Sequence, residues 1–136
     1  MSPEGYVLDS SALLTFIEDE DGAARVDQLL RAEKVWLPWI VLLEVIYITR
    51  KERGEAEADR RYGMIEQMPI TVLWAADEPV LLIAARLKAE NRLSLADAII
   101  AAFAIYMGAT LVHKDPEYDK IGIRLTHEAL PYKAQM

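Results

Sequence analysis

The chain has no cysteine and only two histidines among its 136 residues. The absence of cysteine excludes disulfide bonds, thiolate zinc sites and cysteine nucleophiles, and it agrees with a protein of a reducing compartment. The two histidines, His113 and His127, are too few for a multi-histidine zinc site or for a chain of histidine bases. A metal site in this chain would therefore use mainly oxygen ligands.

A membrane-spanning run and a secretory leader are also missing. The uncharged run from Ala98 to Val112 is too short for a bilayer span and contains Gly108, so a buried helix followed by a strand explains it better. The first residues lack a basic segment followed by an apolar one. We therefore expect a cytoplasmic protein without a membrane segment.

Net positive charge is lacking, since the formal charge is −7 and the pI is about 4.8. This balance argues against a protein that coats nucleic acid by charge alone, although acids that bind a metal would be neutralised locally. Positive side chains gather in one region, where they could contact a phosphate backbone or simply form a solvated helix end. They are Arg50, Lys51, Arg53, Arg60 and Arg61.

Composition and periodicity predict one α/β domain over residues 1–136. The chain is 53% hydrophobic, which suits a single packed core. Strand-like apolar runs alternate with segments of helical periodicity, which predicts a mainly parallel sheet with right-handed crossovers. We expect strands at 6–9, 35–37, 70–74, 109–112 and 123–126. We expect helices at 10–17 (capped by Ser10 and Ser11), 23–34, 38–53, 55–68, 77–91 and 94–107.

Four acids stand in apolar surroundings, far apart in the sequence: Asp9, Glu44, Asp97 and Asp115. A charge held among apolar groups costs several kcal/mol unless it is paired or bound to a metal, and the chain offers few nearby cations. Sites in parallel sheets form beyond the carboxyl ends of the strands, where all four acids can meet. We therefore predict one site for Mg²⁺ or Mn²⁺, the hard ions that oxygen ligands select.

Each acid also has a structural explanation. Asp9 could end a strand or cap a helix, and Asp115 could form a turn. Glu44 could pair with a buried arginine. Asp97 has the spacing of a capping box with Ser94, and an acid near a helix start is favoured by the dipole.

Two further polar residues are candidates for supporting roles. Asp119 is either an additional acid near the site or a solvated charge. His113 could contact substrate, although a structural histidine at the end of a strand is the more common case.

Several segments together carry a family resemblance over nearly the whole chain. The chain resembles a PIN domain, and in size and layout the toxin half of VapBC toxin–antitoxin pairs. The position of His113 departs from the pattern, because the family often has Thr or Ser there. The segments are Asp9 to Leu14, the buried Glu44, Leu93 to Ala98, and Thr110 to Tyr118.

The resemblance implies a PIN-like three-layer α/β/α sandwich and a metal-dependent endoribonuclease. It implies that Asp9, Glu44, Asp97 and Asp115 are the catalytic and metal-binding residues, with Ser11 supporting Asp9. One or two Mg²⁺ or Mn²⁺ ions would activate a water that attacks the RNA phosphodiester bond. The expected partners are RNA, a small VapB-like antitoxin that blocks the site, and a second copy in a homodimer.

Three other readings stay open. A phosphoaspartate enzyme would need a second acid near Asp9, where Ser11 stands instead. A non-catalytic PIN-like module for protein binding would keep the fold without turnover. A stand-alone RNA-processing nuclease would share the chemistry without an antitoxin.

Overall fold

The structure is a computed structural model that describes residues 5–132. Five strands form one sheet in the order β3-β2-β1-β4-β5, and all neighbouring strands are parallel. The strands are β1 (Tyr6–Leu8), β2 (Val35–Pro38), β3 (Thr71–Leu73), β4 (Thr110–His113) and β5 (His127–Ala129). The helices are α1 (Ser10–Ile17), α2 (Ala23–Ala32), α3 (Trp39–Arg53), α4 (Glu55–Glu66), α5 (Glu78–Glu90), α6 (Leu95–Met107) and the 3₁₀ segment η1 (Pro116–Arg124).

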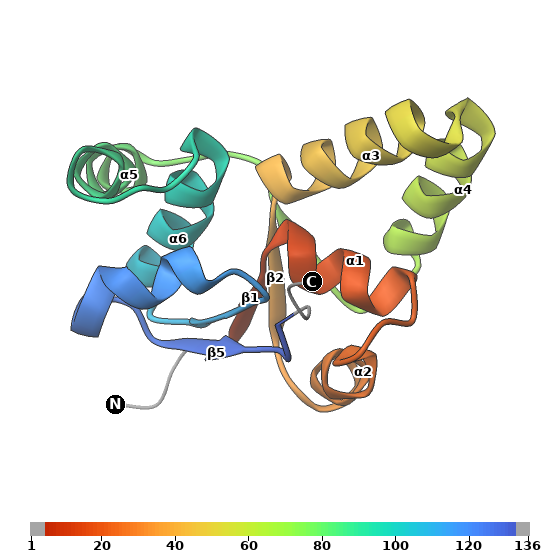
Figure 1. Ribbon diagram of the computed structural model, residues 1–136, viewed down its shortest axis with the longest axis horizontal. Coiled ribbons are helices and arrows are strands. Elements are labelled where there is room, and N and C mark those ends of the chain that lie inside the picture. The colour runs from red at the N-terminus through yellow and green to blue at the C-terminus, as the bar shows by residue number, and fades with distance from the viewer. Residues whose placement is uncertain (1–4, 133–136) are drawn as a thin grey trace.

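Helices cover both faces of the sheet. In Figure 1, α1 to α4 lie on one side of the strands, and α5 and α6 lie on the other. Right-handed crossovers explain this division, because the chain first moves outward from β1 to β3 and then crosses to β4 and β5 on the opposite side of β1. The prediction of a three-layer α/β/α sandwich with a parallel sheet is confirmed.

The central strands are buried on both faces, as expected for a parallel sheet between helical layers. Val7, Leu8, Leu111 and Val112 have no exposed surface. The uncharged run after Asp97 forms most of α6, which packs against these strands, and then leads into β4. Among the described residues, no helix is long and apolar enough to cross a membrane.

The prediction of the last strand is wrong. Residues 116–124 form η1, and β5 begins only at His127, so the expected strand at 123–126 does not exist. Ile121 and Leu125 are both buried, at 6% and 4% exposed, but Gly122 between them has φ +84° and ψ −155°, a kink that interrupts any extended run through this segment. The strand β5 is instead stabilised by backbone pairing with β4. Its sequence, His-Glu-Ala, does not by itself predict a strand.

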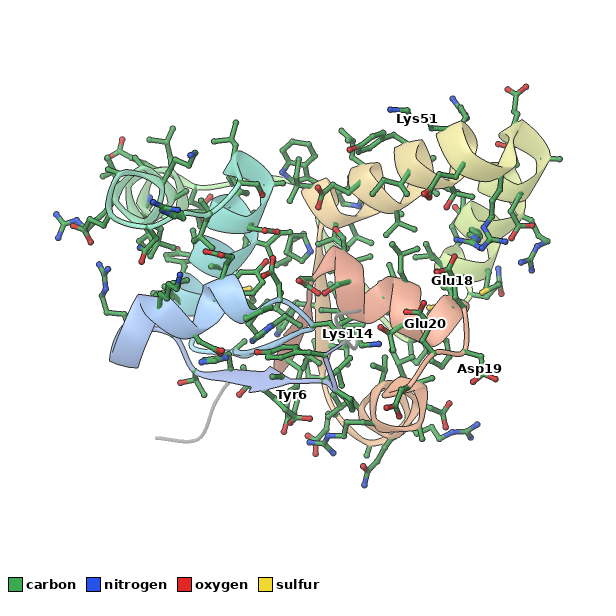
Figure 2. The ribbon with its side chains drawn as sticks, viewed as in Figure 1. Tyr6, Glu18, Asp19, Glu20, Lys51 and Lys114 are labelled. Carbon is green, nitrogen blue, oxygen red and sulfur yellow. The ribbon has the colours of Figure 1, made fainter. Side chains whose placement is uncertain are left out.

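The basic residues at the end of α3 and on α4 mostly form hydrogen bonds and ion pairs within the fold. Arg61 is 4% exposed, and its guanidinium bonds Glu57 at 3.0 Å, Thr49 at 3.2 Å and Glu18 at 3.2 Å. Arg53 also meets Glu18, which lies at the end of α1 (Figure 2). These bonds join α1, α3 and α4. They favour the structural explanation of this basic group over contact with phosphate.

We expect a substitution at Gly5 to be severely destabilising. Gly5 has a φ of +86°, and a Cβ there would lie 2.5 Å from the backbone oxygen of Lys34. Gly5→Ala should lower the free energy of unfolding by more than about 3 kcal/mol, because the added methyl clashes with backbone in a strained conformation. Gly108→Ala is the control: φ is +64°, its Cβ would meet nothing within 4 Å, and we expect a loss of about 1 kcal/mol. Urea denaturation measures both, and equal losses would contradict the steric explanation.

Candidate active site

The four predicted acids lie on four different segments near one edge of the sheet. Asp9 directly follows β1, and Asp115 lies just beyond the end of the neighbouring strand β4. The strand order reverses between β1 and β4, which is where parallel sheets commonly hold their sites. Glu44 belongs to α3 and Asp97 to the first turn of α6, and these two helices pack against each other.

Asp9 directly follows β1 and is the N-cap of α1. Its Oδ1 accepts the backbone N–H of Ala12 at 2.8 Å and the hydroxyl of Ser11 at 2.7 Å. The prediction that Ser10 and Ser11 cap this helix is therefore wrong. Asp9 takes that role because its short side chain reaches the free N–H groups of the first turn.

Ser11 connects the two strand ends. Its hydroxyl donates to Asp9 and also accepts the backbone N–H of Lys114 at 3.0 Å. The amino group of Lys114 points away to Glu20, 3.7 Å from its carboxylate (Figure 2). Lys114 therefore leaves the negative charge of Asp9 and Asp115 without an ion pair.

Glu44 is half-buried on α3, and its carboxylate accepts the hydroxyl of Ser10 at 2.6 Å. The alternative explanation for Glu44 was an ion pair with a buried arginine. Within residues 5–132, Arg61 is the buried arginine, and its three bonds go elsewhere.

Asp97 is held through both its backbone and its side chain. Its N–H donates to the Ser94 hydroxyl at 3.1 Å, so the expected cap of α6 by Ser94 is confirmed. Its Oδ1 accepts the phenol hydroxyl of Tyr118 at 3.0 Å. The capping bond uses the backbone of Asp97, so the carboxylate itself is not the cap and stays available for another partner.

Asp115 begins η1 as its N-cap. Its Oδ1 accepts the N–H of Glu117 at 2.9 Å, and its own N–H donates to Nδ1 of His113 at 3.1 Å. The turn-forming role expected for Asp115 is therefore confirmed, and this hydrogen bond occupies one oxygen of its carboxylate.

The pKa values show that the acids influence one another. The pKa of Asp9 is raised from 3.8 to about 7, mainly by burial. The charge of Asp97 acts in the same direction, and the hydrogen bonds from Ser11 and Ala12 oppose it. Burial also raises the pKa of Asp97, and Asp115 and Glu44 act in the same direction while Tyr118 opposes them. Asp97 thus interacts with each of the other three acids.

The donor set fits a hydrated divalent cation. Carboxylate oxygens suit hard ions such as Mg²⁺ and Mn²⁺. In the described part of the chain, no three of the four acids have ligand atoms all within 4.8 Å of one another. Mg²⁺ keeps several of its waters, so some of these carboxylates would reach the ion through water rather than directly.

A second cluster of polar side chains has ligand atoms that lie closer together, but the tautomer of its buried histidine does not suit a metal. His113, Asp119 and His127 offer ligand atoms within 4.8 Å of one another. However, Nδ1 of His113 accepts the Asp115 N–H, so neutral His113 carries its proton on Nε2 and donates it to Nδ1 of His127, 2.8 Å away. A metal on Nε2 would force the proton onto Nδ1, against the Asp115 N–H. We therefore describe this group as a hydrogen-bonded histidine pair.

His113 and Asp119 thus belong to this histidine pair and its surroundings and not to the group of four acids. His113 is fully buried, as expected for a structural histidine, and burial together with His127 lowers its pKa to about 4. Asp119 is exposed and accepts the Tyr132 hydroxyl at 3.3 Å. The supporting role of Asp119 stays a prediction.

Two residues of the site were missed from the sequence, Ser10 and Tyr118. The sequence contained a hint for Ser10. Consecutive residues of a helix point in different directions, so Ser10 and Ser11 cannot both bond Asp9, and one of them needs another partner. Tyr118 had no such signal. Its hydroxyl reaches Asp97 across 21 positions of sequence, which only the fold brings together.

Comparison with known proteins agrees with this geometry. The family model of the PIN domain matches residues 6–124. VapBC2 from Rickettsia felis, solved with a promoter DNA fragment, is 18% identical with a TM-score of 0.77, covering 93% of this chain and 98% of that one. VapBC-1 from nontypeable Haemophilus influenzae is 21% identical with a TM-score of 0.72, covering 91% and 96%.

A third solved structure, VapC20 from Mycobacterium tuberculosis, is described as a toxin that cleaves the sarcin–ricin loop. It is 14% identical with a TM-score of 0.68, covering 87% of this chain and 95% of that one. At these identities the likeness concerns the fold. No curated protein matches the chain.

We expect metal-free protein to lose stability as the pH rises. The folded pKa of Asp9, about 7, lies above its usual 3.8, so its contribution is fully present below pH 3.8 and is lost as the pH rises through 7. Asp9→Asn keeps an acceptor for Ser11 and Ala12 without the charge. It should raise the free energy of unfolding at pH 8 by roughly 2 to 4 kcal/mol. Urea denaturation in EDTA at pH 5 and pH 8 measures this, and a gain that is equal at both pH values would contradict the charge explanation.

Proposed function

This chain belongs to the PIN-domain family, and we propose that it is a metal-dependent endoribonuclease that hydrolyses RNA phosphodiester bonds. The observation that carries the proposal is the position of four carboxylates at the carboxyl edge of the sheet: Asp9 after β1, Asp115 after the neighbouring β4, and Glu44 and Asp97 on the contacting helices α3 and α6. A fold alone does not determine an activity, so the proposal depends on these carboxylates. It is supported by the solved VapC20 structure, whose description names RNA-loop cleavage by a toxin of similar fold.

In this proposal the four acids hold one or two Mg²⁺ or Mn²⁺ ions. The bound metal would lower the pKa of a water for in-line attack and stabilise charge on the phosphate. The protein supplies the arrangement: Ser11 and Ala12 fix Asp9, Ser10 fixes Glu44, and the N–H of Glu117 fixes Asp115. The family resemblance implies products with 5′-phosphate and 3′-hydroxyl ends: the water oxygen bonds to phosphorus, the P–O3′ bond breaks, and the leaving 3′ oxygen takes up a proton, while the 2′-hydroxyl takes no part.

We further propose that the protein acts in the cytoplasm as the toxin of a type II toxin–antitoxin pair. Its antitoxin would be a small VapB-like protein that covers the acids. The support comes from the similar solved structures, which are VapBC assemblies. The four acids form no ion pair with another residue between positions 5 and 132, which also makes them a suitable target for a basic side chain of an inhibitor.

Exposed apolar side chains beside the site support protein partners, including a second copy of the chain. Trp39 borders two apolar cavities, one of about 340 Å³ with Tyr62 and Trp74, and one of about 510 Å³ with Leu81 and Leu95. Trp74 and Leu95 are each 65% exposed. Apolar surface of this kind is typical of interaction sites.

The proposal predicts cleavage of end-labelled RNA in Mg²⁺ or Mn²⁺ and none in EDTA. Asp9→Asn and Asp97→Asn should each lower the cleavage rate by more than about 100-fold, because each removes a charge that would hold the metal. Asp59→Asn, an exposed aspartate on α4, is the matched control and should cleave like the wild type.

The same assay separates the alternatives. Products ending in 2′,3′-cyclic phosphate, or cleavage that survives in both variants, would contradict the mechanism. Mn²⁺ binding without cleavage of any RNA would favour the non-catalytic binding module. Cleavage by a protein for which no small inhibitory partner co-purifies would favour a stand-alone processing nuclease.

A further inference from the structure

Tyr118 is a fully buried tyrosine whose hydroxyl meets one of the four acids. The side chain has no exposed surface, and its hydroxyl donates to Oδ1 of Asp97 at 3.0 Å. A buried phenol group needs a hydrogen-bond partner, and here the partner is a carboxylate of the site rather than a backbone group. The bond joins η1 to the first turn of α6.

The ring of Tyr118 is held by a second set of contacts. It packs on the ring of His113, with 4.6 Å between ring centroids and 54° between the planes. His113 is itself fixed by His127 on one side and by the Asp115 N–H on the other. The hydroxyl therefore approaches Asp97 from a ring that cannot turn away without disturbing β4 and β5.

The bond matters because the Asp97 carboxylate is in an unfavourable environment. Asp97 is half-buried and shares this end of the sheet with three other acids, and the Tyr118 hydroxyl is the donor that its Oδ1 accepts. The hydroxyl occupies Oδ1 and leaves Oδ2 as the freer oxygen. A charge-assisted bond of this kind both fixes the carboxylate and keeps it ready to bind a cation.

We propose that Tyr118 is a positioning residue whose hydroxyl orients the Asp97 carboxylate for a divalent cation. This inference rests on the proposed function, because it assigns a role toward the same metal. It adds a residue beyond the four acids and Ser11. Tyr118 does not touch the reacting atoms. It acts through Asp97, whose Oδ1 accepts its hydroxyl, and it also favours the ionised form of the nearby Asp9 by lowering the pKa of that acid.

The test is Mn²⁺ binding to the full chain, measured by isothermal titration calorimetry. Tyr118→Phe removes one oxygen and keeps the ring, and we expect it to weaken Mn²⁺ binding by about tenfold or more. Tyr106→Phe is the matched control, since its hydroxyl bonds the exposed Asp77 at 3.3 Å, which is not one of the four acids, and should leave the affinity unchanged. Circular dichroism of the metal-free variants checks that both remain folded.

The outcomes separate this inference from the proposed function. If the wild type binds Mn²⁺, Asp97→Asn does not, and Tyr118→Phe binds like the wild type, then the role of Tyr118 is overturned while the metal site stands. If the wild type itself binds no Mn²⁺ and cleaves no RNA, both proposals fail.

A second measurement uses the wild type, in case Tyr118→Phe does not fold. The Tyr118 hydroxyl proton is buried and bonded, so it should exchange slowly enough to give its own proton NMR signal. Adding Mg²⁺ should shift that signal, and Asp97→Asn should remove it. A signal that Mg²⁺ leaves unchanged would overturn the inference.

Discussion

Burial of negative charge at the carboxyl edge of the sheet is the constraint on which the rest of the site depends. Asp9 is 3% exposed, and its pKa of about 7 shows how strongly the site opposes ionisation. Asp97 adds to this opposition and experiences it from Asp115 and Glu44. Such an arrangement disfavours the ionised forms of Asp9 and Asp97 in the metal-free chain, and a cation that shared the space would make it favourable. In the proposed metal site, the same residues would therefore lower stability without metal and provide affinity for it.

The fold accommodates this constraint by giving the acids structural tasks. Asp9 caps α1, and Asp115 caps η1, so each carboxylate uses one oxygen to accept a backbone N–H. Both caps lie where a strand of the parallel sheet ends and a helical segment begins. The two strands, β1 and β4, are also those between which the strand order reverses. Structural and chemical roles are thus compatible on one side chain. The capping geometry fixes the position of the carboxylate before any metal arrives.

The sequence predicted four of the five strands, and the structure puts the four acids at one end of the sheet, but the groups that hold the acids were not predicted. Glu44 and Asp97 could be recognised because each is a single charge within a long apolar segment, a pattern that local physics makes expensive. Ser10 and Tyr118 could not be assigned in the same way, since their partners lie 34 and 21 positions away. The last strand failed for a related reason. Its residues, His127 to Ala129, have little intrinsic strand preference and are strand only because β4 offers a free edge.

The acids accept hydrogen bonds from neutral hydroxyl groups and not from cationic side chains, which would leave their charge available for the proposed metal. In residues 5–132, Asp9, Glu44, Asp97 and Asp115 form no ion pair within 4.0 Å, and even Lys114 beside Asp115 turns to Glu20. An arginine or lysine would satisfy a carboxylate but would also neutralise it and compete with a divalent ion. A hydroxyl donates one hydrogen bond and leaves the negative charge in place. Serine hydroxyls do this for Asp9 and Glu44, and the phenol of Tyr118 does it for Asp97. Within the described residues the acids therefore have no cationic partner, and in the proposed function an ion or a basic partner would neutralise them.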